Sequence, residues 1–313
     1  MEYQYVLGID IGGTNTAYGL VDAKGALLVQ GSIPTKGYKT VQQYVKAIGK
    51  ELTHVIKKVK RQNIKGVGIG APSANYYTGE IVNAPNLDWQ GVIPIATLLR
   101  EELGLEVVLT NDANAAAIGE MQYGAAKGMK DFIMLTLGTG VGTGIVANGQ
   151  LIYGHDGFAG EVGHIIAVRD GRECNCGRLG CLERYASATG IALTAEKWLD
   201  VRTDKSLLRD FKGKITSKIL YDVALTGDKL ALDIFDYTGM ILGQTLADVV
   251  AVTSPQAFIF FGGLAKAGDL IMKPAKKHME NNLLHLYRNK VQFLQSQLPD
   301  TEAAILGASA LAW

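Results

Sequence analysis

The three cysteines of this chain lie within eight consecutive positions, and a histidine stands ten residues before the first of them. His164, Cys174, Cys176 and Cys181 offer one nitrogen and three sulfur ligands, the mixture found at closed tetrahedral zinc sites. Cys174 and Cys176 are one residue apart, too tight for an easy disulfide, and the number of cysteines is odd. Buried cysteines that serve only as small apolar residues are the alternative, but chance would scatter them along the chain. The sequence therefore predicts a structural zinc ion held by these four residues.

Carboxylate and amide side chains follow two predicted strands at the points where the strands end. Residues 107–110 form a predicted strand that runs directly into Asn111 and Asp112, and the alanine-rich segment after them begins a helix. Because α/β proteins build their sites at the carboxyl ends of strands, both are candidate site residues, although Asp112 could simply cap the helix. Asp10 ends the first predicted strand, where its carboxylate could hold a magnesium ion through water.

Two strand–turn–strand units, residues 5–21 and 132–152, begin about 130 residues apart. In the first unit the turn amides and two hydroxyls would point into one concavity suited to phosphate oxygens. The residues concerned are Gly12, Gly13, Thr14 and Thr16. An ordinary Gly-Gly hairpin with a solvated Asp10 is the alternative. Repetition of the unit indicates a duplicated architecture with a cleft between its halves.

Other nucleotide-binding patterns are missing from the sequence. No segment matches the G-x-x-x-x-G-K-[ST] pattern of a P-loop. The alternating glycines at 138, 140, 142 and 144 lack the third glycine of G-x-G-x-x-G, and a strand follows them instead of a helix, which disfavours a dinucleotide fold. Apolar residues at three- and four-residue spacing predict a helix over residues 40–62. A last helix over residues 303–313 is expected to pack back on an earlier part of the chain.

Length and composition are those of an ordinary globular protein, with 313 residues of which 48% are hydrophobic and 19% charged. This length exceeds what one core normally supports, so two domains are expected. A net charge of +1 gives no reason to expect nucleic acid or an anionic membrane as a partner. The start lacks a secretory signal pattern and the clustered cysteines fit a reducing compartment, so a cytoplasmic location is expected. The uncharged run 132–154 is long enough to span a membrane, but its six glycines favour a turn-rich β segment.

Several motifs, taken in order along the chain, resemble the ROK family (repressor, open reading frame, kinase) of actin-like sugar kinases. They are DIGGT at 10–14, NAPNL at 83–87, NDANAAA at 111–117, LGTGVGTGI at 137–145, EVGH at 161–164 with CNCGRLGCLE at 174–183, and FGG at 261–263. The resemblance implies an α/β chain with the two-domain actin-like ATPase (ribonuclease H-like) fold, an interdomain cleft and a zinc-binding loop at 164–183. The smaller domain is expected to comprise residues 1–114 with a C-terminal helix at about 300–313, and the larger one residues 115–299.

The resemblance also implies roles for individual residues. Asp112 resembles the general base that takes the proton from the sugar hydroxyl attacking the γ-phosphate of ATP. The sugar-binding positions are matched by Asn86, Asn111, Asp112, Glu161, His164 and Glu183. The two phosphate motifs are matched by Asp10, Gly12, Gly13 and Thr14 and by Gly138, Thr139, Gly140 and Gly142, and the adenosine motif by Gly262 and Gly263. His164 would ligate zinc with one ring nitrogen and offer the other to the sugar, and Mg²⁺ would accompany ATP.

An ATP-dependent hexokinase acting on glucose is the first expectation, because Glu161, His164 and Glu183 together resemble the glucokinase branch. Kinases of N-acetylmannosamine, N-acetylglucosamine or other hexoses share the same motifs and are the alternative. The family also contains sugar-responsive transcriptional repressors, which carry a helix-turn-helix domain ahead of the first phosphate motif. Here that motif begins at Tyr5 and the charge provides no basic face, which disfavours DNA binding. The resemblance further implies a homodimer.

Overall fold

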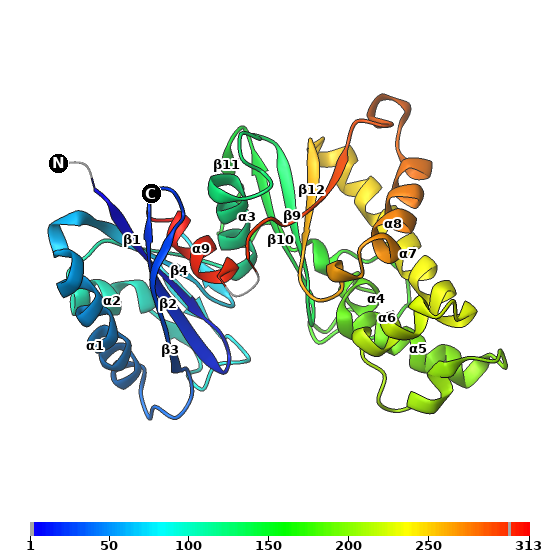
Figure 1. Cartoon of the computed structure of the whole chain (residues 1–313), viewed down its shortest axis with the longest axis horizontal. Helices are drawn as coiled ribbons and strands as arrows, with labels where there is room; N and C mark the ends of the chain where they lie inside the picture. Colours follow the sequence, from blue (N-terminus) through cyan, green and yellow to red (C-terminus); the bar gives the residue numbers. More distant parts are fainter. Residues whose placement is uncertain (1–2, 300–301) are drawn as a thin grey trace.

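The computed structural model describes residues 3–299 and 302–313 and folds them into two lobes (Figure 1). Each lobe is built on one mixed sheet, and the two sheets follow the same plan. The first has the order β3-β2-β1-β4-β8, with β1 (Tyr5–Ile11), β2 (Asn15–Asp22), β3 (Leu27–Pro34), β4 (Ile64–Gly70) and β8 (Val107–Thr110). The second has the order β11-β10-β9-β12-β13, with β9 (Phe132–Leu137), β10 (Val141–Ala147), β11 (Gln150–Leu151), β12 (Ala257–Phe261) and β13 (Gln292–Gln295).

In both sheets three antiparallel strands are followed by two parallel ones, which confirms the predicted duplication. The uncharged run 132–154 forms the β9–β10–β11 part of the second sheet, as its glycines predict. Within the described residues, no helix has the length and apolar character that a membrane crossing requires. The domain boundaries at residues 114 and 299 stay predictions, and residues 300 and 301, at the expected start of the C-terminal segment, lie outside the described residues.

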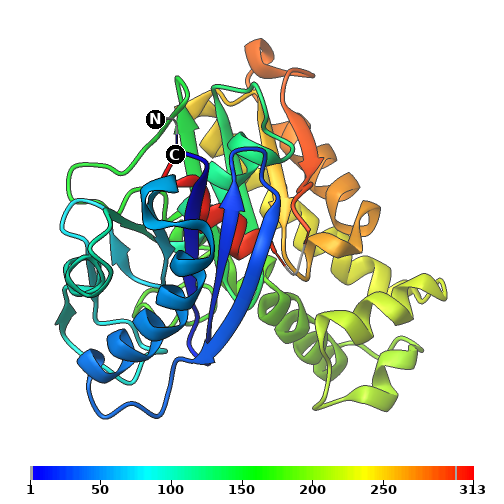
Figure 2. The same cartoon turned by 60° about the vertical axis from the view of Figure 1, so that its left-hand side comes forward.

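Two helices, α3 (Asp112–Tyr123) and α9 (Ala303–Ala310), lie side by side between the sheets (Figures 1 and 2). Helix α9 packs on β1, β2 and β4, as expected for the last helix, while α3 packs on β9 and β10. Glycines permit this close approach, because a Cβ on Gly68 would lie 1.8 Å from the carbonyl oxygen of Ala308. Between the helices, a Cβ on Gly119 would lie 2.8 Å from the Cα of Gly307. The helix pair therefore joins the lobes through backbone contact.

The first lobe is completed by helices and a small second sheet. Its helices are α1 (Val41–Val59), η1 (Arg61–Asn63) and α2 (Ile95–Leu103), and the small sheet is made of β5 (Ala74–Asn75), β6 (Glu80–Val82) and β7 (Val92–Ile93). Thr40 caps α1, and its side chain accepts a hydrogen bond from the N–H of Gln43. Helix α1 ends three residues before the predicted Gln62, because Lys60 adopts a positive φ of 65°.

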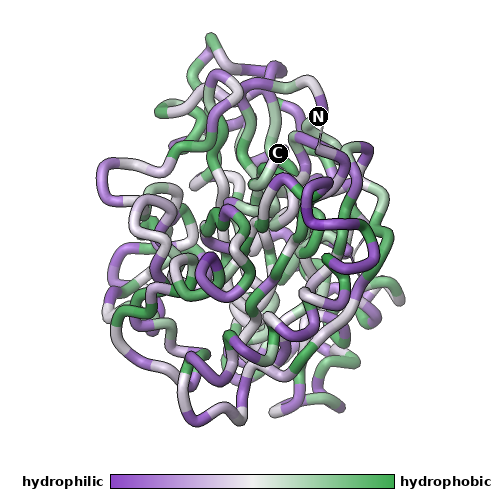
Figure 3. Tube along the Cα trace, turned by 90° about the vertical axis from the view of Figure 1, so that its left-hand side faces the viewer, coloured by the Kyte–Doolittle hydropathy of each residue, from purple (hydrophilic) through white to green (hydrophobic). Residues whose placement is uncertain are grey.

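The second lobe carries the zinc loop and most of the remaining helices. These are η2 (Val162–His164), α4 (Glu183–Ala186), α5 (Ala188–Val201), η3 (Leu207–Phe211), α6 (Ser217–Leu225), α7 (Lys229–Thr253), η4 (Ala265–Ala267), α8 (Asp269–Asn282) and η5 (His285–Tyr287). Helices α7 and α8 pack along each other, and Gly239 leaves room for Pro274 inside α8. Separate apolar cores fill the two lobes, and many peripheral loops are hydrophilic (Figure 3).

Candidate active site

A cavity of about 680 Å³ lies between the two lobes. Its walls include the end of β1, the start of α3, the β9–β10 turn, the segment after β12 and the start of α9. Predicted site residues from both lobes line it: Asp10, Asn86, Asn111, Asp112, Gly138, Thr139, Gly140, Gly142, Glu161, His164, Glu183 and Gly262. The fold thus brings together the predicted base, sugar-binding side chains and phosphate turn.

The other predicted nucleotide-site residues lie beside this cavity without lining it. Gly12, Gly13 and Thr14 form the β1–β2 turn, where a Cβ on Gly13 would lie 2.9 Å from the Cβ of Asn86. Gly263 directly follows the lining residue Gly262. The β1–β2 turn therefore contacts the loop that carries Asn86.

The expectation that the Thr16 hydroxyl points into the same concavity is wrong. Thr16 is fully buried, and its hydroxyl lies 2.9 Å from the hydroxyls of both Thr35 and Tyr44. Because Tyr44 belongs to α1, this contact places the Thr16 side chain on the face of the sheet that α1 covers. Thr16 is a core residue that ties β2 to α1.

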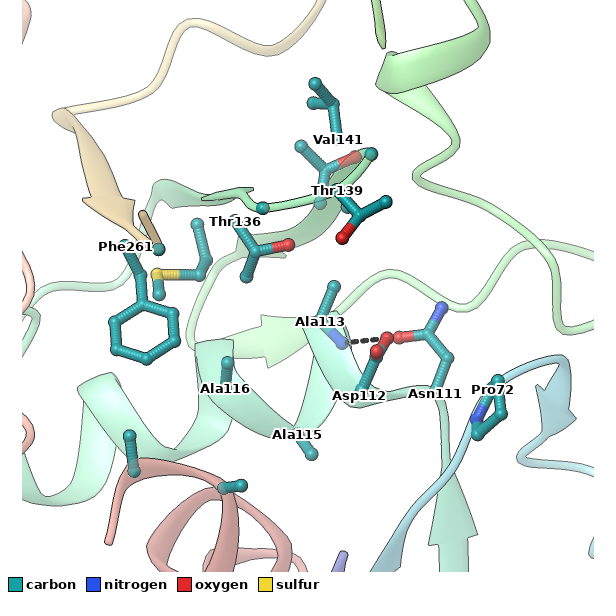
Figure 4. A pocket seen from close by; sticks show the side chains of 18 of the residues that line it. Pro72, Asn111, Asp112, Ala113, Ala115, Ala116, Thr136, Thr139, Val141 and Phe261 are labelled. Atoms are coloured by element: carbon teal, nitrogen blue, oxygen red, sulfur yellow. Dashed lines mark hydrogen bonds between the residues drawn. The ribbon is translucent and has the colours of Figure 1, made fainter. Parts of the chain in front are cut away.

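Asn111, and not Asp112, caps α3. The Oδ1 atom of Asn111 accepts a hydrogen bond from the N–H of Asn114 at 2.7 Å. Asp112 is the first helical residue, and its Oδ1 accepts from the N–H of Ala113 at 2.8 Å. No other hydrogen bond to the Asp112 carboxylate exists within the described residues. Asp112 and Asn111 point from the helix start toward Thr139 on the opposite wall (Figure 4).

Asp10 provides a second, half-buried carboxylate close to Asp112. Burial, together with the negative charge of Asp112, raises the pKa of Asp10 to about 6. A Cβ on Gly70 would lie 3.8 Å from both the Oδ1 of Asp10 and the Cα of Asp112. Neither carboxylate forms an ion pair among the described residues. Two oxygen donors of this kind fit a hard divalent cation such as Mg²⁺, which would relieve their repulsion.

The β9–β10 turn, residues 138–140, lines the cavity and is closed by a hydrogen bond from Gly138 N–H to Gly140 O at 3.1 Å. Other segments hold three consecutive carbonyls, since Leu137 O accepts from Leu264 N–H at 3.0 Å and Gly138 O from Ala188 N–H at 2.8 Å. Thr139 O accepts from the Thr189 hydroxyl at 2.5 Å. The N–H groups of Thr139 and Gly140 have no partner among the residues that the structure describes. Free amides on a turn whose carbonyls are fixed can bind anionic oxygens.

The four predicted zinc ligands converge at one point. Their ligand atoms all lie within 4.8 Å of one another, with Cys176 Sγ 3.6 Å from Cys181 Sγ and Cys174 Sγ 3.7 Å from His164 Nδ1. A tetrahedral ion with Zn–S bonds of about 2.3 Å separates its sulfurs by about 3.8 Å, so this cluster fits zinc. Despite the opposing effect of burial, hydrogen bonds from Arg178 N–H and from the Cys174 and Cys181 thiols lower the pKa of Cys176 to about 7.

The zinc cluster adjoins the sugar-binding carboxylates predicted from the sequence. His164 turns Nδ1 to the cysteines, while its Nε2 lies 4.0 Å from a carboxylate oxygen of Glu161. The Cys174 thiol donates to Glu183 Oε1 at 3.1 Å. Burial raises the pKa of Glu161; His164 opposes this shift, and the charges of Asp112 and Glu183 add to it. These residues form one acidic wall of the cavity.

Several lining residues were missed by the sequence analysis. Glu120 on α3 is fully buried, accepts a hydrogen bond from the N–H of Ala125 at 2.6 Å and bonds the hydroxyl of Ser296. Ser296 lies 176 positions away, so no local pattern connects the two. Thr136 and Thr143 also line the cavity from β9 and β10. Strand alternation within 132–147 was the signal that could have indicated them.

Comparison with known proteins gives the same class of protein as the fold and the cavity. The model of the ROK family matches residues 6–313. The chain is 36% identical over 315 residues to a glucokinase of Halalkalibacterium halodurans, covering 98% of this chain and 94% of that protein. It is 27% identical over 319 residues to the xylose repressor of Bacillus subtilis, covering 98% of this chain and 76% of the repressor.

Among solved structures, the chain is similar to a ROK family glucokinase from Streptomyces griseus in complex with glucose and AMPPNP. The TM-score is 0.75 at 33% identity, and the match covers 98% of each chain. Two lobes with repeated mixed sheets and a cavity between them define an actin-like ATPase fold, as expected from the sequence. The chain belongs to the ROK family.

Proposed function

We propose that this ATP-dependent sugar kinase of the ROK family transfers the γ-phosphoryl group of ATP to the 6-hydroxyl of glucose. The observation that carries the proposal is one cavity in which the Asp112 carboxylate, bonded among the described residues only to the N–H of Ala113, faces a turn with free N–H groups beside an acidic wall that adjoins the cluster of His164 and the cysteines. The glucokinases among the relatives support glucose as the sugar.

The polar wall suits a sugar, because a pyranose presents hydroxyl groups on every edge. Glu161, Glu183 and His164 accept or donate hydrogen bonds on one side, and Asn86 and Asn111 offer amide groups on the other. A buried acceptor left without its hydroxyl costs about 1–3 kcal/mol, so the arrangement can discriminate between epimers. Asn86 is exposed, and its side chain forms no hydrogen bond within the described residues, which leaves it available to substrate.

Asp112 acts as the general base in this proposal. Its carboxylate accepts the proton from the 6-hydroxyl as the sugar oxygen attacks the γ-phosphorus of ATP. The new bond joins that oxygen to phosphorus, the bond from phosphorus to the β,γ-bridging oxygen breaks, and ADP leaves. Phosphoryl transfer needs little covalent chemistry from the protein beyond this base, positioning and charge neutralisation. The position of Asp112 opposite the 138–140 turn supports the assignment.

The nucleotide phosphates are assigned to the 138–140 turn and to the neighbourhood of Asp10. The N–H groups of Thr139 and Gly140 donate to phosphoryl oxygens. Asp10, with Asp112 nearby, would hold Mg²⁺, which neutralises charge on the β- and γ-phosphoryl oxygens when bound. Gly12, Gly13 and Thr14 are assigned to the same phosphates, and Gly262, which lines the cavity, is assigned with Gly263 to adenosine.

We assign zinc to His164, Cys174, Cys176 and Cys181. Four protein ligands make a closed site, so the ion has a structural role. It would fix the His164 ring with Nε2 toward the sugar and hold the loop that leads into Glu183. The metal then sets sugar-site geometry without taking part in phosphoryl transfer.

A coupled assay of ADP formation over a sugar panel tests the proposal. The panel contains glucose, mannose, fructose, allose, N-acetylglucosamine and N-acetylmannosamine. We expect turnover with glucose to exceed that with every other sugar. Asp112→Asn should lower kcat by about 10²- to 10⁴-fold, the usual contribution of a general base, while the Kd for glucose measured by calorimetry changes little.

The possible results separate the parts of the proposal. Preference for an N-acetyl sugar would retain the mechanism and overturn the choice of glucose. Asp112→Asn with wild-type turnover would overturn the base assignment. Wild-type protein that binds glucose without turning over any sugar would overturn the kinase proposal and point to sugar sensing.

A further inference from the structure

Ser187 separates α4 from α5, and with the first three residues of α5 it forms a segment, residues 187–190, that we call the α4–α5 junction. This junction contacts the 138–140 turn directly. The N–H of Ala188 donates to the carbonyl of Gly138 at 2.8 Å. The hydroxyl of Thr189 donates to the carbonyl of Thr139 at 2.5 Å. The Gly138 carbonyl shares a peptide plane with the Thr139 N–H, and the Thr139 carbonyl shares one with the Gly140 N–H. These two bonds therefore fix the orientation of both free N–H groups.

The same junction is tied to Glu183 at the sugar end of the cavity. The Ser187 hydroxyl donates to the backbone carbonyl of Glu183 at 2.6 Å and accepts from the N–H of Gly190 at 2.9 Å. A Cβ on Gly190 would lie 2.7 Å from that carbonyl oxygen, so the contact requires glycine. The hydroxyls of Ser187 and Thr189 are 3.0 Å apart. Each hydroxyl donates its one proton to a backbone carbonyl, so these two oxygens touch without a hydrogen bond. The route from Glu183 to Thr139 therefore consists of two hydrogen bonds joined by the backbone of residues 187–189.

The Glu183 side chain also lies close to the 138–140 turn. A Cβ on Gly140 would lie 2.6 Å from Glu183 Oε2, so the carboxylate rests against the turn. The base of the junction is fixed by Arg172, whose guanidinium donates to the carbonyls of Arg184 and Gly190 at 2.7 and 3.0 Å. The junction is thus a short rigid segment with Glu183 at one end and the turn at the other.

We propose that Ser187 and Thr189 are positioning residues that couple the sugar end of the cavity to the phosphate turn. The inference rests on the proposed kinase function. A sugar bound to Glu183 restrains the start of α4, and the Ser187–Thr189 contacts pass that restraint to the Thr139 carbonyl. The turn then keeps its N–H groups toward the nucleotide. Glucose binding should therefore tighten ATP binding, and by thermodynamic reciprocity ATP should tighten glucose binding by the same factor.

The experiment measures that factor by calorimetry with AMPPNP and Mg²⁺, with and without saturating glucose. Thr189→Val removes the hydroxyl and keeps the side-chain volume. We expect the coupling factor to fall, and the KM for ATP to rise, by about 2- to 10-fold, the range for one hydrogen bond. The glucose Kd without nucleotide should stay within about 2-fold. Thr189→Ser should restore both values.

Thr226→Val is the matched control, because Thr226 is also exposed and donates to a backbone carbonyl, that of Val223 at 2.7 Å. It should behave as the wild type. Ser187→Ala is the second test variant and should lower the coupling factor as Thr189→Val does, with zinc content and melting temperature showing that each variant is folded.

A wild-type coupling factor of one would overturn the inference, as would Thr189→Val with the values of Thr226→Val. Calorimetry needs no turnover, so these results are independent of the sugar-panel assay. A kinase without coupling would refute only this inference. Coupled binding without phosphorylation would refute only the kinase proposal.

Discussion

The two hairpin turns of this protein, 12–14 after β1 and 138–140 after β9, hold equivalent places in two sheets of the same plan but differ in chemistry. The first follows a half-buried carboxylate, Asp10, and ends in the exposed Thr14. The second has no acidic residue of its own, and other segments of its lobe fix its carbonyls. Each turn has two N–H groups without a partner among the described residues, Gly13 and Thr14 in the first and Thr139 and Gly140 in the second. Both turns can therefore offer amides to anionic oxygens, but only the first follows a carboxylate in its own strand, one that suits a cation.

The difference comes from what surrounds each turn. The second turn is held by the α4–α5 junction and by Leu264, both of which belong to the larger lobe. The first turn closes on itself through Gly12 N–H to Asn15 O at 3.1 Å, and Thr14 O accepts from Thr35 N–H at 2.9 Å. Two turns on the same plan are thus held differently, the second by other segments of its lobe and the first by the two strands of its own hairpin and by β3.

The largest expected effect tests the Asp10 carboxylate beside the first turn. Asp10→Asn should stabilise the protein at neutral pH without divalent cations, because the folded state must keep a carboxylate whose pKa is raised from 3.8 to about 6. The stability that this group contributes is complete below its unfolded pKa and is lost as the pH rises through the folded pKa. Removing the charge should therefore raise the free energy of unfolding by about 2–3 kcal/mol above pH 6 and by little near pH 4.

Urea denaturation of both proteins at the two pH values measures this difference. The substitution should also weaken the response of activity to Mg²⁺, since the cation loses a charged ligand. Equal stability of the two proteins at pH 7 would show that Asp10 is not held in the repulsive environment described above.

The second effect tests the support that zinc is expected to give to the sugar-binding end of the cavity, next to the second turn. Cys176→Ser removes one of four ligands and should lower zinc affinity by about 10- to 100-fold or more, with loss of metal on dialysis against a chelator. The KM for glucose should rise because His164 and the loop before Glu183 lose the ion that holds them. Asp10 and the first turn, which do not contact the zinc cluster, should keep their positions. Metal content by mass spectrometry and glucose kinetics measure the two effects. Full activity with bound zinc would contradict the assigned ligand set.

The smallest expected effect separates two glycines of the second turn. A methyl group on Gly140 would meet only Glu183, through an atom 2.6 Å away, whereas one on Gly138 would meet nothing within 4 Å. Because the Glu183 carboxylate can swing aside, Gly140→Ala should leave the melting temperature nearly unchanged. It should raise the KM for glucose by about 2- to 10-fold, the range for one hydrogen bond. Gly138→Ala is the control, and an equal glucose KM in both variants would contradict the contact.

Much of the candidate site could be predicted because its signals are local. The predicted zinc ligands lie within 18 consecutive positions, 164–181. The apolar strand 107–110 followed by an alanine-rich segment places Asn111 and Asp112 at a strand-to-helix junction. Thr16 was placed wrongly because a threonine two residues after a turn gives no indication of which face a helix will cover. The alternative that Asp112 serves only to cap α3 could not be excluded from the sequence, since Asn and Asp both make good caps, and the structure gives that role to Asn111.

The sequence by itself determined the family and the repeated strand–turn–strand units, and it predicted the clustering of the four zinc-ligand candidates, because short-range spacing and residue chemistry suffice for each. Only the tertiary structure decided which of these residues share a cavity, and that the start of α5 holds the phosphate turn. Thr139 and Thr189 are 50 positions apart, and Glu120 and Ser296 are 176 apart. Contacts at such separations depend on how the lobes pack, and no local pattern in the chain records them.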